Sequence, residues 1–202
     1  MLVDDAGRWV FVHIPKTAGQ AVSAALGHRH ESHHHRLDGI DDYKDYFRFC
    51  FVRHPAERFI SAYRYSVHMA KRGVVERHPV RRLILENDLT RSVGGFIDYV
   101  MEEEVDFLRS LHFRPQSYWI QRGRPQFVGR YETFDADLRR VGRIIGAEVP
   151  DELPRVNSQN IKIDAGLKRR HRIWIREVYE VDFETLGYRH SWAEASTASG
   201  SD

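Results

Sequence analysis

Two short segments of the chain combine residue types that can hold an oxyanion such as a phosphate group. In the first, HIPKTAGQA (residues 13–21), a small-residue turn contains Lys16 and Gly19. A segment suited to a helix follows, and the N–H groups that begin a helix point outward where its dipole favours negative charge. Because Lys16 precedes the glycine, the turn does not fit the GxxxxGK(S/T) pattern of a Walker A loop. The segment predicts a phosphate-binding turn, and a plain strand-to-helix turn is the alternative.

The second segment, FVRHPAERFISAY (residues 51–63), places an arginine and a serine eight positions apart. Arg53 ends an apolar run, and ligands of open α/β sheets collect at the carboxyl ends of buried strands. The guanidinium of Arg53 and the hydroxyl of Ser61 can bind one phosphate group from two sides. The alternative is that Arg53 pairs with a nearby carboxylate, while Arg58 and Arg64 only solvate a helix.

These residues need a scaffold that positions them, and the hydrophobic pattern predicts alternating strands and helices. Runs rich in β-branched and aromatic residues predict strands over 8–14, 46–52 and 126–129. Such alternation is typical of a three-layer α/β domain with a mainly parallel sheet. The first expected helix is AVSAAL (residues 21–26), which follows the turn 16–19 and ends near Gly27. The other expected helices are a stretch that starts at Pro55, pieces of 75–122 interrupted at Gly94-Gly95 and at Pro115, 135–145, and 167–183 with Ile173, Val178 and Val181 facing the core.

The composition limits the class of protein further. The chain has 202 residues, which predicts a single domain over 1–192 followed by a frayed tail over 193–202. A formal net charge of +2 argues against binding to nucleic acid or to a membrane surface mainly by bulk charge. Only five of the 31 basic residues are lysine. Arginine suits bidentate capture of phosphate or sulfate groups, and codon usage is the alternative explanation.

Cysteine content and apolar runs bear on the cellular compartment. The lone Cys50 excludes an intramolecular disulfide and fits a reducing environment. No apolar run approaches the roughly 20 residues that a bilayer crossing needs, and the N-terminus lacks a signal-peptide pattern. These features predict a protein of the cytoplasm with no membrane span.

Taken together, the two phosphate-binding segments resemble the two signatures of sulfotransferases that use 3′-phosphoadenosine 5′-phosphosulfate (PAPS). The likeness is to the carbohydrate-type, Golgi-related branch and its small bacterial relatives, and it covers roughly residues 9–190. PKTAG and VRHPAERFISAY carry the two signatures, and four further segments resemble the family in the same order: LHFRPQSYWI, FVGRYETFDADLRRVGRIIG, LPRVNSQN and YEVDFETLGY.

The resemblance implies a P-loop-like three-layer α/β/α sandwich and assigns roles to particular residues. PAPS would be the co-substrate, with no metal required, and the acceptor would be a hydroxyl of a carbohydrate or a small metabolite. Lys16 would act near the bridging oxygen. The implied nucleotide-binding residues are Lys16, Thr17, Ala18, Gly19, Gln20 and Ala21 for the 5′-phosphosulfate, and Arg53 and Ser61 for the 3′-phosphate.

The chain departs from the family pattern at two places. Gln20-Ala21 stands where Thr-Ser is usual, which removes two hydroxyls from the phosphosulfate turn, and His54 stands where Asp or Asn is usual. These departures keep a non-catalytic nucleotide-binding relative among the possible functions. A phosphotransferase on a related scaffold is a further alternative, although the chain has neither a Walker A motif nor an Asp-rich magnesium motif.

Five of the 12 histidines fall within positions 28–35 and supply candidates for the catalytic base. A histidine with a pKa near neutrality can take the proton of an acceptor hydroxyl. The family register favours His34, followed by His35 and then His33. A solvated loop without a catalytic role and a transition-metal site are the alternatives.

Overall fold

The computed structural model describes residues 1–28, 37–76, 78–153 and 167–189. It divides the chain into two compact units, which are described separately below. The sheet unit comprises Met1–His54 and Gln116–Gln159, and the helical unit comprises Pro55–Pro115 and Asn160–Asp202. The single domain over 1–192 stays a prediction, and the tail over 193–202 lies outside the described residues.

Four short strands form the sheet of the first unit, in the order β1-β2-β3-β4. These strands are β1 (Leu2–Asp4), β2 (Trp9–Phe11), β3 (Phe47–Val52) and β4 (Phe127–Arg130). The β1–β2 pair is antiparallel, whereas β2–β3 and β3–β4 are parallel. The three predicted strands are therefore confirmed as the parallel part of the sheet, and the sequence pattern missed the edge strand β1.

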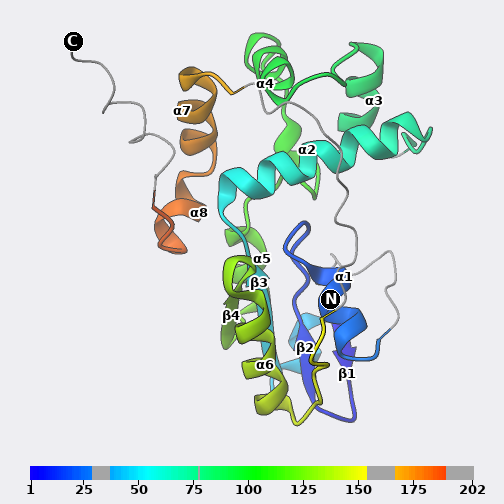
Figure 1. Ribbon diagram of the computed structural model, residues 1–202, viewed down its shortest axis with the longest axis vertical. Coiled ribbons are helices and arrows are strands. Elements are labelled where there is room, and N and C mark those ends of the chain that lie inside the picture. The colour runs from blue at the N-terminus through cyan, green and yellow to red at the C-terminus, as the bar shows by residue number, and fades with distance from the viewer. Residues whose placement is uncertain (29–36, 77, 154–166, 190–202) are drawn as a thin grey trace. The chain divides into compact units, whose positions relative to one another are not determined.

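Helices cover both faces of this sheet (Figure 1). On one face, α1 (Gly19–Ala25) and α6 (Phe134–Ile145) bury an apolar cluster that includes Phe11, Phe49 and Leu138. On the other face, α5 (Ser117–Gly123) lies so close to β2 that a Cβ added at Gly123 would be 2.7 Å from Val12 Cγ1. Side chains alternate between the two faces along each strand, as a pleated strand requires. The predicted α/β sandwich with a mainly parallel central sheet is confirmed.

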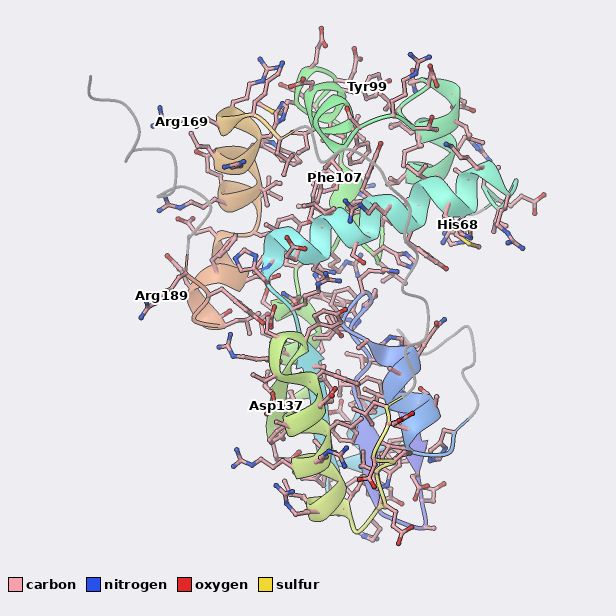
Figure 2. All side chains as sticks on the ribbon, in the orientation of Figure 1. His68, Tyr99, Phe107, Asp137, Arg169 and Arg189 are labelled. Carbon is pink, nitrogen blue, oxygen red and sulfur yellow. The ribbon has the colours of Figure 1, made fainter. Side chains whose placement is uncertain are left out.

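The helical unit is built around a core rich in aromatic side chains. The core includes Phe59, Phe96, Phe107 and Phe113, and Figure 2 labels Phe107 among the side chains of this unit. The unit's helices are α2 (Pro55–Lys71), α3 (Pro79–Glu86), α4 (Val93–Glu102), α7 (Arg169–Val178) and α8 (Glu180–Thr185), and it also contains the 3₁₀ turn η2 (Phe107–Arg109). The 3₁₀ turns η1 (Ile40–Tyr43) and η3 (Tyr131–Thr133) belong to the sheet unit.

Two details of the predicted helices are wrong. Gly94-Gly95 does not interrupt a helix but lies in the first turn of α4, where the Ser92 hydroxyl accepts a hydrogen bond from the Gly95 N–H at 3.0 Å. The stretch 167–183 forms two helices rather than one, and two of the three residues predicted to face the core are exposed. Ile173 and Val181 are 42% and 50% exposed.

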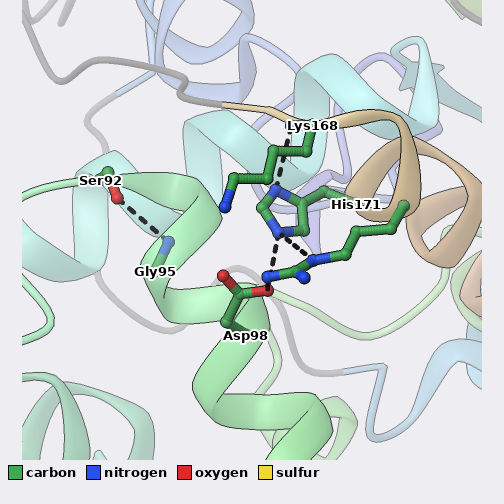
Figure 3. A network of polar contacts seen from close by, with 6 residues as sticks. Ser92, Gly95, Asp98, Lys168 and His171 are labelled. Atoms are coloured by element: carbon green, nitrogen blue, oxygen red, sulfur yellow. Dashed lines mark hydrogen bonds and ion pairs between the residues drawn. The ribbon is translucent and has the colours of Figure 1, made fainter.

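A polar network joins α7 to α4 in the helical unit (Figure 3). The ring of His171 is buried, and its Nδ1 accepts a hydrogen bond from the Lys168 N–H at 3.2 Å. The proton is therefore on Nε2, which donates to Asp98 Oδ1 at 2.7 Å. Arg170 Nη2 donates to the same oxygen at 2.7 Å. These contacts fix the start of α7 against α4.

Candidate oxyanion-binding site

The turn between β2 and α1 has an unusual backbone at two positions. Lys16 and Ala18 both have φ of 71°, the left-handed region that residues other than glycine rarely adopt. Such strain persists only where the surrounding structure holds it, and it concentrates at ligand-binding turns. Backbone that alternates between left- and right-handed conformations points successive N–H groups toward a common concavity suited to an anion.

The start of α1 leaves hydrogen-bond donors available for such an anion. Ala18 is the N-cap residue and no side chain caps the helix. In the part of the chain that the structure describes, no backbone hydrogen bond uses the N–H groups of Ala18, Gly19, Gln20 or Ala21. The first turn also contains no acidic residue that would compete with an anion. Lys16, two residues before the N-cap Ala18, adds a positive charge.

Two residues of the turn shape it from within rather than offering side chains to a ligand. The Thr17 side chain is fully buried and its hydroxyl donates to the Ile14 carbonyl at 2.9 Å, which closes the turn. A Cβ added at Gly19 would lie 1.8 Å from His13 Nε2. The absence of a side chain at Gly19 is thus explained by the imidazole of His13, which stacks on Phe11 with ring centroids 5.4 Å apart. His13 is 5% exposed and therefore belongs to the interior of the unit.

Gln20 also belongs to this turn, and its Oε1 atom is buried and has no hydrogen-bond partner among the described residues. A buried acceptor of this kind is normally paired with a donor, such as an ordered water or a donor group of a ligand. Because an oxyanion donates no hydrogen bond, this atom does not itself bind the anion. The turn therefore fits an oxyanion group through four backbone donors and Lys16.

Arg53 lies at the same edge of the sheet as this turn. The two segments follow the carboxyl ends of β2 and β3, which are adjacent parallel strands. The guanidinium of Arg53 stacks on the ring of Tyr131, with Cζ 4.2 Å from the ring centroid. The buried carboxamide of Gln116 accepts a hydrogen bond from the Arg53 N–H and donates one to the Arg53 carbonyl. The structure thus brings the residues 16–21 and Arg53 to one sheet edge of a single unit.

The other predicted site residues lie elsewhere in the chain. Ser61 is a half-buried residue of α2 in the helical unit, so its part in a shared phosphate site stays a prediction. His34 and His35 lie outside the described residues, as does His33. His28 follows α1 and forms an ion pair with Asp4, with Nε2 3.2 Å from Oδ2.

Sequence patterns could not reveal the contacts that support Arg53. Gln116 and Arg53 are 63 positions apart, so no local spacing rule connects them. The same holds for Glu132, whose Oε1 accepts a hydrogen bond from the His54 N–H at 2.7 Å across 78 positions. What the sequence did offer was the position of Gln116 and Glu132 next to the ends of predicted helices or strands.

The sheet, the donors at the start of α1 and the adjacent arginine define an α/β protein with a candidate oxyanion site at one sheet edge. A sequence model described as "Sulfotransferase family" matches residues 1–189, and the chain belongs to that family. Carbohydrate sulfotransferase 11 of Rattus norvegicus is 26% identical over 176 residues, which covers 72% of this chain and 47% of that protein. The chain thus spans about half the length of this curated relative. No solved structure gives a significant match.

Two kinds of feature are absent from the part of the chain that the structure describes. Across residues 1–28, 37–76, 78–153 and 167–189, no helix combines the length and the apolar character that a membrane crossing needs. Within the same ranges, no group of three or more His, Cys, Asp or Glu side chains is arranged to hold a metal ion.

Proposed function

We propose that the protein is a PAPS-dependent sulfotransferase that acts on a hydroxyl of a carbohydrate or a small metabolite. The observation that supports this most directly is the strained turn of residues 16–21. It presents four backbone N–H groups and Lys16 at the edge of the sheet where Arg53 also lies. Membership of the sulfotransferase family and the similarity to a carbohydrate sulfotransferase support the same reaction and the same kind of acceptor.

The residues of the turn and Arg53 would hold two different groups of the nucleotide. The N–H groups of residues 18–21 suit the oxygens of the 5′-phosphosulfate, because helix-start donors and the helix dipole favour negative charge. Arg53, together with Ser61, would bind the 3′-phosphate, since a guanidinium can donate two parallel hydrogen bonds to one phosphate. Bound PAPS supplies the sulfuryl group that is transferred.

Lys16 would stabilise the negative charge that develops on the leaving phosphate oxygen. Preorganised positive charge at a developing oxyanion is a large contribution to catalysis of group transfer. His34 or His35 would accept the proton of the attacking hydroxyl. No metal is needed for these steps, and the location in the cytoplasm stays a prediction from the sequence.

The proposal is tested by a transfer assay with ³⁵S-labelled PAPS and a panel of oligosaccharide and hydroxyl-metabolite acceptors. We expect labelled product with the wild-type protein and a kcat about 10²–10³-fold lower for Lys16→Met. Lys44→Met is the matched control, because Lys44 is exposed and follows η1. This control should keep the wild-type rate.

The same assay separates the proposal from its alternatives. Equal loss of rate in both lysine variants would contradict the assigned role of Lys16. A protein that binds 3′,5′-adenosine bisphosphate but transfers no label would be the non-catalytic relative. Stabilisation by ATP but not by the bisphosphate would favour a phosphotransferase.

A further inference from the structure

We infer that Gln116 and Tyr131 are positioning residues for Arg53: the Gln116 carboxamide holds its peptide groups and the Tyr131 ring holds its guanidinium plane. This inference rests on the proposed function of Arg53 as the ligand of the 3′-phosphate. Gln116 and Tyr131 lie outside the two phosphate-binding signatures, and their role follows from contacts within the sheet unit.

Gln116 replaces the missing strand neighbour of Arg53. The parallel ladder between β3 and β4 ends at the pair Val52 and Arg130, so the peptide groups of Arg53 lie beyond it. Gln116 Oε1 accepts a hydrogen bond from the Arg53 N–H at 2.9 Å, and Gln116 Nε2 donates to the Arg53 carbonyl at 2.8 Å. Two opposed hydrogen bonds to one residue are what a neighbouring strand would provide. The Gln116 side chain is fully buried, so these bonds are shielded from water.

Further contacts restrict the side chain of Arg53 and the residue that follows it. The guanidinium carbon of Arg53 lies over the ring of Tyr131, 4.2 Å from the ring centroid, a contact that favours the positive charge at this position. The next peptide N–H, of His54, donates to Glu132 Oε1 at 2.7 Å. The backbone and the end of the Arg53 side chain are therefore each held by a separate group.

Holding Arg53 in this way would raise its affinity for a phosphate group. An unrestrained arginine loses side-chain and backbone freedom when it binds a ligand, and that loss weakens the complex. An arginine that is already oriented loses less. Removing the Gln116 carboxamide should therefore weaken binding of the 3′-phosphate without removing any atom that touches the ligand.

The test is calorimetric titration of Gln116→Met with 3′,5′-adenosine bisphosphate and with 5′-AMP, which lacks the 3′-phosphate. Methionine has a similar length but cannot make either hydrogen bond. We expect affinity for the bisphosphate to fall about tenfold and affinity for 5′-AMP to stay unchanged.

The chain offers a matched control at the opposite end of the same strand. Gln126 Oε1 accepts a hydrogen bond from the Arg48 N–H at 2.6 Å, so this glutamine also bonds the backbone of β3 through its side chain. Arg48 is five positions before Arg53, or about 16 Å along an extended strand. Gln126→Met should leave the affinity for both nucleotides unchanged. A similar loss in both variants would overturn the positioning role and indicate a general effect on the sheet.

A double-mutant cycle shows whether Gln116 acts through Arg53. Arg53→Ala alone should weaken bisphosphate binding about 100-fold. Adding Gln116→Met to that variant should cause no further loss, because no guanidinium remains to be positioned. Additive losses would overturn the inference. If wild type and Arg53→Ala bind the bisphosphate equally, the proposed function of Arg53 fails instead, and the two failures are thereby distinguished.

Tyr131 gives an independent test that does not disturb the interior, since its side chain is 41% exposed. Tyr131→Ala removes the ring under the guanidinium and should weaken bisphosphate binding about threefold to tenfold, with no change for 5′-AMP. Tyr131→Phe keeps the ring and should restore wild-type affinity. Wild-type affinity in Tyr131→Ala would overturn the role of this residue, whether or not Gln116→Met folds.

Discussion

Replacing Gly19 by alanine should destabilise the protein through a collision with one identified side chain. The added Cβ would lie 1.8 Å from Nε2 of His13 and 2.1 Å from its Cδ2. His13 is 5% exposed and stacks on Phe11, so its ring has no open space into which it can turn. Neighbouring groups must shift, which is the costly case for a substitution that adds volume to a packed interior.

The expected size follows from two opposing contributions. Overpacking of this kind costs about 3 kcal/mol, and alanine regains about 1 kcal/mol by restricting the unfolded chain. The net loss is about 2 kcal/mol, or about 4–8 °C in Tm for a chain of this size. Urea unfolding followed by tryptophan fluorescence measures it, because Trp9 is buried in the same apolar cluster as α1.

A control and a rescue variant make this prediction specific. Gly95→Ala places the same substitution in the first turn of α4, where the nearest atom would be Ser92 Oγ at 3.2 Å, and should change stability by less than about 1 kcal/mol. In Gly19→Ala combined with His13→Ala, the space left by the imidazole accommodates the new methyl group. The double variant should therefore be more stable than the sum of the two single losses predicts. Strict additivity would refute the contact with His13 as the reason for glycine at this position.

Three further experiments have outcomes that the structure predicts. Arg58→Met should cost about 2–4 kcal/mol in urea unfolding, because the fully buried guanidinium donates to two main-chain carbonyls at 3.1 and 2.6 Å; a loss below about 1 kcal/mol would contradict this role. Burial raises the pKa of Asp98, but hydrogen bonds from His171 and Arg170 outweigh it and hold the pKa below its usual value of 3.8. The stability that the Asp98 carboxylate contributes should be complete above pH 3.8, be lost as the pH falls through its lower pKa in the folded protein, and be absent from Asp98→Asn. If Asp98→Asn and the wild type lost stability in acid identically, the role of these hydrogen bonds would be contradicted. Burial raises the pKa of the Cys50 thiol, so it should react with Ellman's reagent only after unfolding, and rapid reaction of the native protein would contradict its position in β3.

Strong local signals in the sequence predicted the sheet and the first site segment. The strand at Trp9–Phe11, the turn after it and the helix from Gly19 each follow from local composition, and they position Lys16 without any long-range information. The edge strand Leu2–Asp4 was missed because three residues carry no periodic pattern.

Long-range packing explains the features that sequence patterns could not predict. Ile173 and Val181 fit a helical repeat, yet both are exposed, because packing selects the face of α7 that contains Ile175, and Tyr179 enters the core beside it. The need for glycine at position 19 also comes from long-range packing, because the imidazole of His13 occupies the space that a side chain would take.

The most direct test of the proposed nucleotide site is equilibrium titration of the wild-type protein with 3′,5′-adenosine bisphosphate, ADP and ATP. The arrangement of residues 16–21 and Arg53 at one sheet edge predicts that the bisphosphate binds at least about tenfold more tightly than ADP or ATP, and that Arg53→Ala removes this preference. Equal affinities for the three nucleotides, or a preference that survives in Arg53→Ala, would contradict the proposed 3′-phosphate site.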